Sequence, residues 1–228
     1  MPLRVVFIGA PGVGKGTFAG IVCKQLGWKH FNMGATMREH VAGGTPLGVC
    51  IRDELAAGKL LPDGVVNELA LDYLGGAGIG ADVLIDGYPR TVGQAELLLS
   101  KSKGLKLLAM HIKLDRWVCV EKLLARQECK TCGRGFNTAH IVTRGFDMPA
   151  ILPNPSTCPQ GTGKCAPVLS TRNDDTRETI EHRFNEFYQR TQPVLDVFRA
   201  HGVLSEFTVT KGIADASALL KQLQERIN

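Results

Sequence analysis

Short apolar segments alternate with segments of helical periodicity along this chain. Segments of strand length with apolar residues, which we expect to form strands, span residues 3–8, 28–31, 83–85, 105–114 and 203–208. Apolar residues recur at helical spacing over residues 17–26, 63–73, 115–127 and 216–227. This alternation predicts an α/β protein in which helices pack on a sheet of buried parallel strands.

Two parts of the chain depart from this alternation. Residues 32–62 are predicted to form two short helices joined by the turn GGTPLG, Gly43 to Gly48. Residues 128–170 are rich in Gly, Pro, Cys and Thr and have few periodic apolar positions, which is typical of a lid, a binding loop or a metal module. A long amphipathic helix follows, and we expect Pro193 to kink or interrupt it.

The stretch GAPGVGKGT, Gly9 to Thr17, lies between the first apolar run and the first helical segment. It contains the spacing G-x-x-x-x-G-K of a phosphate-binding loop, in the strand–loop–helix context that such a loop requires. Glycines allow backbone N–H groups to surround a phosphate at the positive end of the helix, and Lys15 can reach the terminal phosphates. The pattern therefore predicts binding of a nucleoside triphosphate, with an ordinary tight turn as the alternative.

The stretch DVLIDGYPRT, Asp82 to Thr91, places an acidic residue at the end of a second buried strand. Because parallel sheets bind ligands at the carboxyl ends of their strands, we expect Asp86 to hold Mg²⁺ through water, beside Thr17 of the loop. A helix cap is the alternative role for Asp86. Gly87 and Pro89 predict a sharp turn that directs Arg90 into the same crevice, and Thr91 is expected to cap the helix that carries Gln94.

Composition narrows the class of protein. The chain has 228 residues, a net charge of +5 and no apolar run long enough to cross a bilayer. A basic protein can bind nucleic acid, but these arginines are scattered and several lie in motifs that can hold nucleotide phosphates. The loop begins at the ninth residue, which leaves no room for a targeting peptide, so a cytoplasmic location is expected.

Seven cysteines in such a chain favour thiols or a metal site over disulfides. Four of them lie in the segment 128–170: Cys129, Cys132, Cys158 and Cys165. Four thiolates suit tetrahedral Zn²⁺, which can stabilise a segment too small to have its own core. The second pair is separated by six residues instead of two, so a structural zinc site, with His140 as a substitute ligand, and reduced thiols both stay open.

The order of these motifs resembles that of the long-lid adenylate kinases. The matching stretches are GAPGVGKGT, the G-x-x-M-R segment at Gly34 to Arg38, AGKLLPD at Ala57 to Asp63, LIDGYPRTVGQ at Leu84 to Gln94, and TRNDD at Thr171 to Asp175. The resemblance implies a P-loop kinase core with a five-stranded parallel sheet and helices on both faces. The implied core is 1–31, 63–127 and 171–228, with a helical monophosphate-binding insert at 32–62 and a long irregular lid at 128–170.

The resemblance also implies a reaction and a set of residues for it. The reaction is reversible transfer of the ATP γ-phosphate to AMP, which gives two ADP and depends on Mg²⁺, in a monomer. The implied ATP-binding residues are Gly12, Val13, Gly14, Lys15, Gly16, Thr17, Lys122 and Arg126. The implied AMP-binding residues are Met33, Arg38, Lys59, Leu60, Leu61, Gly87, Arg90, Gln94, Arg172 and Arg183. The implied catalytic residues are Lys15, Arg90, Arg126, Arg172 and Arg183.

Three positions depart from the family's pattern. Met33 and Ala35 stand where a threonine and an acidic residue are usual, so a kinase of UMP, CMP or another monophosphate is the alternative reading. Lys122 stands where an arginine usually lies against the ATP adenine, and lysine has no planar group to stack, which leaves the donor triphosphate open. A non-enzymatic nucleotide- or nucleic-acid-binding protein is the more distant alternative.

Overall fold

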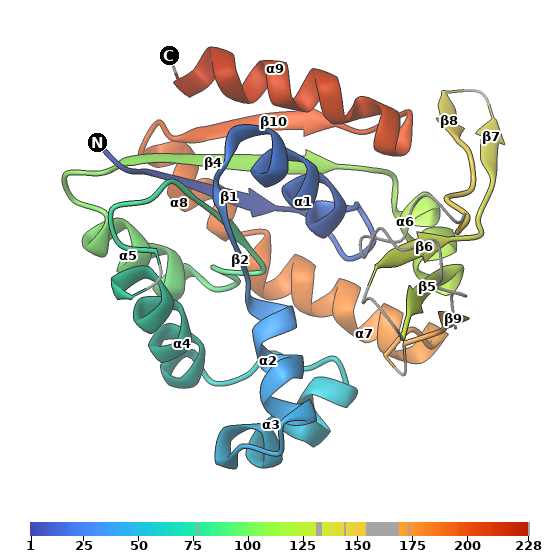
Figure 1. The fold of residues 1–228 in the computed structure, drawn as a ribbon, viewed down its shortest axis with the longest axis horizontal. Coiled ribbons are helices and arrows are strands. Elements are labelled where there is room, and N and C mark those ends of the chain that lie inside the picture. The colour runs from blue at the N-terminus through green and yellow to red at the C-terminus, as the bar shows by residue number, and fades with distance from the viewer. Residues whose placement is uncertain (77, 131–133, 144, 154–168, 173, 228) are drawn as a thin grey trace.

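The computed structural model describes residues 1–76, 78–130, 134–143, 145–153, 169–172 and 174–227. Its centre is a five-stranded sheet in the order β10–β4–β1–β3–β2 with all neighbours parallel (Figure 1). The strands are β1 (Leu3–Ile8), β2 (Lys29–Asn32), β3 (Val83–Asp86), β4 (Lys106–Lys113) and β10 (Leu204–Thr208). The predicted α/β fold with a parallel sheet is confirmed.

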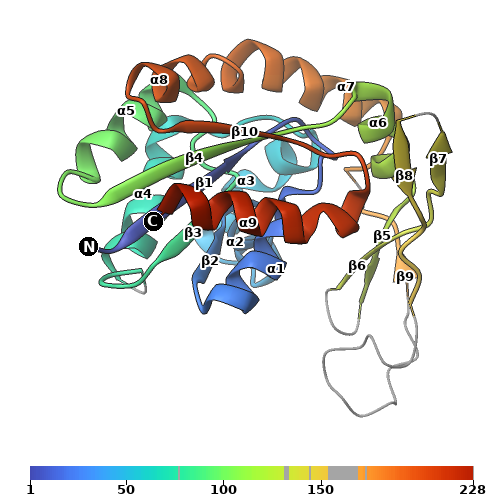
Figure 2. The same cartoon turned by 90° about the horizontal axis from the view of Figure 1, so that it is seen from above.

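Alternate residues of β1 point into two apolar cores, one on each face of the sheet. Val5 and Phe7 belong to one cluster, and Val6 and Ile8 belong to the other. Helices on the first face are α1 (Lys15–Leu26), α6 (Arg116–Leu124), α7 (Arg177–Glu186) and α9 (Ala216–Ile227). Helices on the second face are α4 (Asp63–Gly75), α5 (Val92–Lys101) and α8 (Val194–Ala200). Figure 2 shows α9 and α1 on one side of the sheet and α5 and α8 on the other.

The strand register brings the predicted phosphate loop and Asp86 to one edge of the sheet. Phe7 of β1 is paired with Asp86, the last residue of β3. Ile8, the last residue of β1, is paired with His111 near the end of β4. The segments that leave these strands therefore meet at the carboxyl edge, where parallel sheets bind ligands.

The insert consists of α2 (Met33–Ala42) and α3 (Pro46–Ala56), as the sequence predicts. Asn32 caps α2, because its side chain accepts a hydrogen bond from the backbone N–H of Ala35. Thr45 caps α3 in the same way through Gly48, and Pro46 occupies the first turn, where its missing N–H has no cost. Figure 1 shows the pair of helices projecting below the sheet.

The helix expected over residues 115–127 is shorter, because α6 ends at Leu124. From Arg126 onward the chain is a strand, β5 (Arg126–Cys129), which pairs with β6 (Gly135–Asn137) and β9 (Leu169–Ser170). The backbone groups that would have continued the helix form antiparallel hydrogen bonds instead. Lys122 and Arg126 are four residues apart in sequence, but Lys122 lies in α6 and Arg126 in β5, so the two cations do not share a helix face.

Part of the predicted irregular lid is a hairpin that packs on the core. Strands β7 (Ile141–Thr143) and β8 (Phe146–Met148) pair in antiparallel fashion. Ile141 and Met148 are buried in the same cluster as α1 and α9. The backbone N–H of Asp147 donates to the carbonyl of Thr210, 2.9 Å away, just before the 3₁₀ turn η2 (Gly212–Asp215). This hairpin joins the base of the lid to the carboxyl-terminal part of the core.

The long amphipathic helix is interrupted, as Pro193 predicts. Between α7 and α8 lies a π-helical turn, η1 (Phe187–Thr191), in which the N–H of Gln192 donates to the carbonyl of Phe187. Proline has no N–H to continue the α-helical ladder, so the chain restarts as α8. No helix within the described part of the chain is long and apolar enough to cross a membrane.

Candidate active site

The phosphate loop has the backbone geometry that its glycines predict. Gly12 and Gly14 have positive φ angles of 87° and 96°, a region that other residues rarely adopt. A Cβ atom on Gly12 would lie 2.6 Å from the carbonyl oxygen of Cys119, and one on Gly9 would lie 2.4 Å from that of Ile112. The loop therefore requires glycine both for its turns and for its close approach to β4 and α6.

Lys15, the first residue of α1, folds back over the loop. Its Nζ donates to the carbonyl oxygens of Gly9 at 2.7 Å and Ala10 at 3.0 Å. Burial lowers the pKa of Lys15 to about 8; the carboxylate of Asp86 opposes this shift, and Arg90 and Arg183 reinforce it. A nearby phosphate would favour the charged ammonium. A polyphosphate in the loop would therefore raise the pKa of Lys15 and form an ion pair with it.

Asp86 lies against the loop at the end of β3 and is 6% exposed. A Cβ on Gly16 would lie 3.3 Å from Asp86 Oδ2, so the glycine at this position admits the carboxylate closely. Asn32 Nδ2 donates to the same oxygen at 2.7 Å. These contacts fix the carboxylate beside the first turn of α1 and give a reason for glycine where many phosphate loops have serine or threonine.

The residues expected to serve Mg²⁺ fit a hydrated divalent cation. Thr17 is exposed in the first turn of α1, one residue after Gly16, which Asp86 approaches. A carboxylate and a hydroxyl beside a phosphate loop are oxygen ligands of the kind that Mg²⁺ accepts while it keeps most of its waters. No three His, Cys, Asp or Glu side chains in the described ranges cluster closely enough to form a metal cage of their own.

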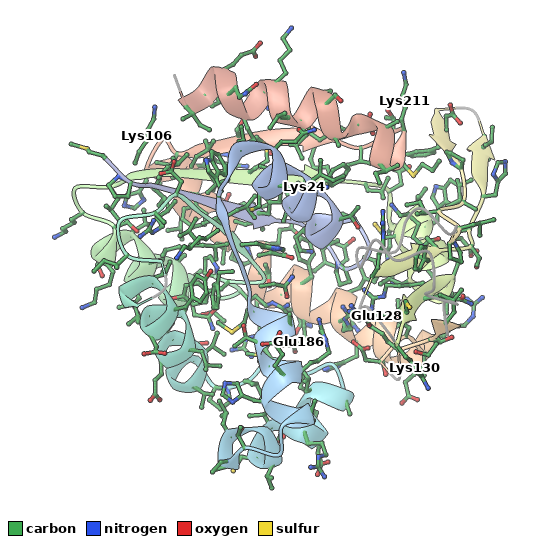
Figure 3. The ribbon with its side chains drawn as sticks, viewed as in Figure 1. Lys24, Lys106, Glu128, Lys130, Glu186 and Lys211 are labelled. Carbon is green, nitrogen blue, oxygen red and sulfur yellow. The ribbon has the colours of Figure 1, made fainter. Side chains whose placement is uncertain are left out.

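The predicted arginines converge on a group of carboxylates at the base of the lid. Arg126 donates from Nε and Nη2 to Asp175 at 2.8 and 2.6 Å. Arg172 donates to both oxygens of Glu128, at 2.8 and 3.3 Å. Figure 3 shows Glu128 on the side of the lid strands that faces the centre of the molecule. In both pairs the flat guanidinium is held in a bidentate arrangement.

Arg183 joins this group from α7. Its Nη1 donates to Asp174 Oδ2 at 3.1 Å and lies 3.6 Å from Asp175 Oδ1. Burial lowers the pKa of Arg183 to about 10, with Asp174 opposing the shift and the positive charges of Arg126 and Arg90 adding to it. At neutral pH the guanidinium stays charged, so the site holds a dense cluster of cations that can bind several phosphates.

Two cavities meet at Arg90 and Arg183. The first, of about 610 Å³ including its open mouth, lies between the insert and the core; it is lined by Met33, Gly34, Met37, Arg38, Leu55, Gly58, Lys59, Leu60, Leu61, Val66, Gly87, Arg90, Gln94, Asp174 and Arg183. The second, of about 530 Å³, includes Lys15 and Gly9 of the phosphate loop and Glu186, which Figure 3 labels near the centre of the molecule. Every residue implied to bind AMP lines the first cavity except Arg172.

The polar end of Gln94 is held inside the protein. Its Oε1 accepts from the backbone N–H of Arg90 at 2.7 Å, and its Nε2 donates to Asp63 Oδ1 at 2.8 Å. Thr91 caps α5 as predicted, because its Oγ1 accepts from the N–H of Gln94, and the same hydroxyl donates to Asp63 Oδ2. No local sequence pattern indicates Asp63 as a member of this network, because it lies 28 positions from Thr91 in the chain.

Lys122 points toward the phosphate loop, away from Arg126. Its Nζ would lie 3.9 Å from a Cβ built on Gly14, and its carbonyl accepts a hydrogen bond from Asn137 in the lid. Burial lowers the pKa of Lys122, and the interactions of its ammonium group with Cys119 and Asp215 oppose this shift. Lys122 therefore adds a cation to the loop, while Arg126 belongs to the arginine–carboxylate group.

The proposed zinc ligands fall mostly outside the described residues. Cys132, Cys158 and Cys165 lie there, whereas Cys129 is buried in β5 and the alternative ligand His140 is exposed.

Two polar residues next to Asp86 were missed in the sequence. Asn32 is the last residue of β2 and His30 lies two residues before it, with His30 Nε2 3.9 Å from Asp86 Oδ2. Burial lowers the pKa of His30 despite the neighbouring carboxylate. The available signal was positional and concerned Asn32: it ends a strand that runs parallel to β3, and polar residues at adjacent strand ends meet at the edge of the sheet.

The chain is similar over most of its length to known proteins. A family model described as adenylate kinase matches residues 7–203. The chain is 36% identical to adenylate kinase 1, chloroplastic, of Arabidopsis thaliana over 92% of this chain and 74% of that protein. It is 32% identical to adenylate kinase of Streptomyces griseus subsp. griseus, over 95% and 94% of the two chains. It is also 32% identical to GTP:AMP phosphotransferase of Plasmodium falciparum, over 93% and 92%.

The similarity is therefore distributed over nearly the whole chain and includes the phosphate loop, the insert and the arginine-bearing segments. With this extent of match, the resemblance seen in the sequence is confirmed: the chain belongs to the adenylate kinase family and is a phosphotransferase of the nucleoside monophosphate kinase type.

Proposed function

We propose that the protein transfers the γ-phosphate of ATP reversibly to AMP and forms two ADP. The observation that supports this most directly is the meeting of two cavities at Arg90 and Arg183. One cavity contains Lys15 and the phosphate loop, and the other has an apolar wall with Met33 and the amide of Gln94. A triphosphate in the cavity with the phosphate loop and a monophosphate in the cavity with Gln94 would meet end to end at the two guanidinium groups.

The side chains at this junction suit phosphoryl transfer. The AMP phosphate is already a nucleophile, so the reaction needs positioning and charge stabilisation more than a general base. In the proposed mechanism, Lys15 and the loop N–H groups bind the donor phosphates. Arg38, Arg90, Arg172 and Arg183 orient the acceptor phosphate and stabilise the charge on the transferring group, with Arg126 on the donor side.

Mg²⁺ is the proposed cofactor, held through water by Thr17 and Asp86. When bound, it neutralises charge on the donor phosphates and helps to align them. Asn32 holds Oδ2 of Asp86, which keeps this carboxylate directed at the loop. Closure of the lid would exclude water, which otherwise competes with AMP as the acceptor.

Each nucleotide of the proposed pair has an alternative that differs in its base. The relative from Plasmodium falciparum is named a GTP:AMP phosphotransferase, so GTP is an alternative donor. UMP and CMP are alternative acceptors, because Met33 offers the base no hydroxyl.

A matrix of donors and acceptors tests the proposal. Purified protein is incubated with ATP or GTP, each with AMP, UMP, CMP or GMP, and diphosphates are quantified by chromatography with and without Mg²⁺. The ATP and AMP pair should have the highest kcat/KM, and EDTA should abolish the turnover. Equal or better turnover of UMP would refute AMP as the acceptor, and better turnover with GTP would refute ATP as the donor.

Three further parts of the proposal have separate tests. Elemental analysis of the purified protein decides whether the lid cysteines hold zinc, since a stoichiometric amount supports the site and a trace refutes it. Light scattering tests the expected monomer. Relatives in plants are named chloroplastic, so the proposed cytoplasmic location is tested by fluorescence microscopy of a carboxyl-terminal fusion.

A further inference from the structure

We propose that Asp63 is a positioning residue that makes the acceptor site select a 6-aminopurine over a 6-oxopurine, by fixing the orientation of the Gln94 amide. The inference rests on the proposed use of AMP. Asp63 is the first residue of α4, where the insert rejoins the core, and it is partly buried. It contacts Thr91 and Gln94 of the neighbouring helix α5.

The two partners of Gln94 determine which end of its amide is oxygen. A backbone N–H can only donate, so the atom that faces Arg90 N at 2.7 Å must be Oε1. An ionised carboxylate can only accept, so the atom that faces Asp63 Oδ1 at 2.8 Å must be Nε2. Both contacts favour the same orientation, and rotation of the amide by 180° would break both.

The surroundings also hold Asp63 in place. Its second oxygen, Oδ2, accepts from Thr91 Oγ1 at 2.8 Å, and that hydroxyl accepts from the N–H of Gln94. Both carboxylate oxygens are thus engaged on α5. Gln94 is 2% exposed, so its amide has little room to find other partners in water.

The fixed amide leaves two groups for a ligand in the first cavity, which Gln94 lines. These are one N–H of Nε2 and one lone pair of Oε1. Adenine has an amino donor at C6 beside ring-nitrogen acceptors, whereas a 6-oxopurine has an acceptor at C6. With the amide fixed, adenine can donate to Oε1, but a 6-oxo group placed there would face a second acceptor. A freely rotating amide would accept either base.

The cavity wall that includes Met33 is apolar. Met33 is 1% exposed, lines the cavity and has no hydrogen-bonding group suited to the base. Met37, Leu61 and Val66 add further apolar surface. Among the described side chains that line the base end of the cavity, Gln94 is therefore the one whose hydrogen bonds would distinguish between bases, and its orientation decides which base fits.

AMP and IMP form the matched pair of substrates, because they differ only at C6 and its neighbouring nitrogen. Steady-state kinetics with each are compared for the wild type, Asp63→Leu, Asp63→Asn and Asp72→Leu. Asp63→Leu replaces the carboxylate with an apolar side chain of similar size, so Gln94 Nε2 loses its acceptor. Asp63→Asn keeps an oxygen that can accept from Gln94 Nε2. Asp72 is exposed on the same helix α4 and serves as the control position. Melting curves show whether each variant is folded, and Asp63→Ala replaces Asp63→Leu if that variant is not.

The wild type should prefer AMP to IMP by about 100-fold or more in kcat/KM. Asp63→Leu should reduce this ratio by roughly tenfold, mainly by raising the KM for AMP, because one of two restraints on the amide is lost. Asp63→Asn should keep the ratio within about threefold of the wild type, and Asp72→Leu should leave it unchanged.

An unchanged ratio in Asp63→Leu would overturn the inference. A loss in Asp63→Asn as large as in Asp63→Leu would also overturn it, because the residue would then act through its charge or through folding alone. Wild-type protein that does not phosphorylate AMP would instead refute the proposed function, before any variant is compared.

Discussion

Arg126 donates two hydrogen bonds to the carboxylate of Asp175, whose side chain has no exposed surface. The two residues are 49 positions apart and come from the first strand of the lid and the segment before α7. Asp175 also lies 3.6 Å from Arg183. One buried carboxylate thus links two of the proposed catalytic arginines and the base of the lid to the core.

Loss of this carboxylate should affect both stability and activity. Asp175→Ala leaves Arg126 partly buried without its partner, so we expect the free energy of unfolding to fall by about 2 kcal/mol, together with a marked loss of kcat. Urea unfolding and steady-state kinetics measure the two effects. Asp196→Ala is the control, because Asp196 is 78% exposed and pairs with Arg199 at the surface, where a change within about 0.5 kcal/mol is expected. Equal effects of the two substitutions would contradict the prediction.

Arg90 should contribute to transfer much more than to folding. It is exposed in the site, and its Nε donates to the carbonyl of Gly87. Arg90→Ala should lower kcat by a factor on the order of 10³, because a positioned guanidinium stabilises the transferring phosphoryl group. Arg90→Lys should recover only part of this, since an ammonium cannot bind two oxygens side by side. The melting temperature should stay near that of the wild type; activity within a few-fold of wild type in Arg90→Ala would remove its proposed role.

The low pKa of Lys15 predicts a pH dependence of donor binding. Burial lowers this pKa to about 8 in the free protein, so the ammonium that binds phosphate is progressively lost above that pH. Binding then requires uptake of a proton, and kcat/KM for ATP should fall by up to about tenfold per pH unit above pH 8. With ATP bound, the phosphates favour the charged form, so kcat at saturation should fall only at higher pH. A kcat/KM that stays level between about pH 7.5 and 10 would contradict this assignment.

Gly12 in the phosphate loop and Gly20 within α1 form a matched pair of glycines for a test of the loop. Gly12 has a φ of 87°, and a Cβ there would lie 2.6 Å from a backbone oxygen, so Gly12→Ala should destabilise the fold by about 2 kcal/mol and weaken ATP binding. A Cβ on Gly20, within α1, would have no atom of the described residues within 4 Å. Gly20→Ala should therefore stabilise the protein by up to about 1 kcal/mol, with unchanged kinetics. Thermal melts and ATP titrations would show the contrast.

Much of the fold followed from local patterns. The strand before the loop, the two helices of the insert and the interruption near Pro193 were all visible, because each depends on neighbouring residues: apolar spacing, caps and the missing N–H of proline. The end of α6 was not visible. Residues 125–127 carry no helix-stopping signal, and the helix ends because Arg126 pairs with Asn137 in a sheet formed by distant parts of the lid.

The sequence by itself determined the phosphate loop and the family, because Gly9 to Thr17 act through the backbone of one continuous stretch and the other motifs follow in a recognisable order. The order of the motifs also identified the arginines proposed for the site. Only the tertiary structure decided what those residues contact: Arg172 with Glu128, Arg126 with Asp175, and Gln94 with Asp63. Such pairs join residues 31 to 49 positions apart, and no local spacing encodes a contact that forms only when the insert, the core and the lid pack together.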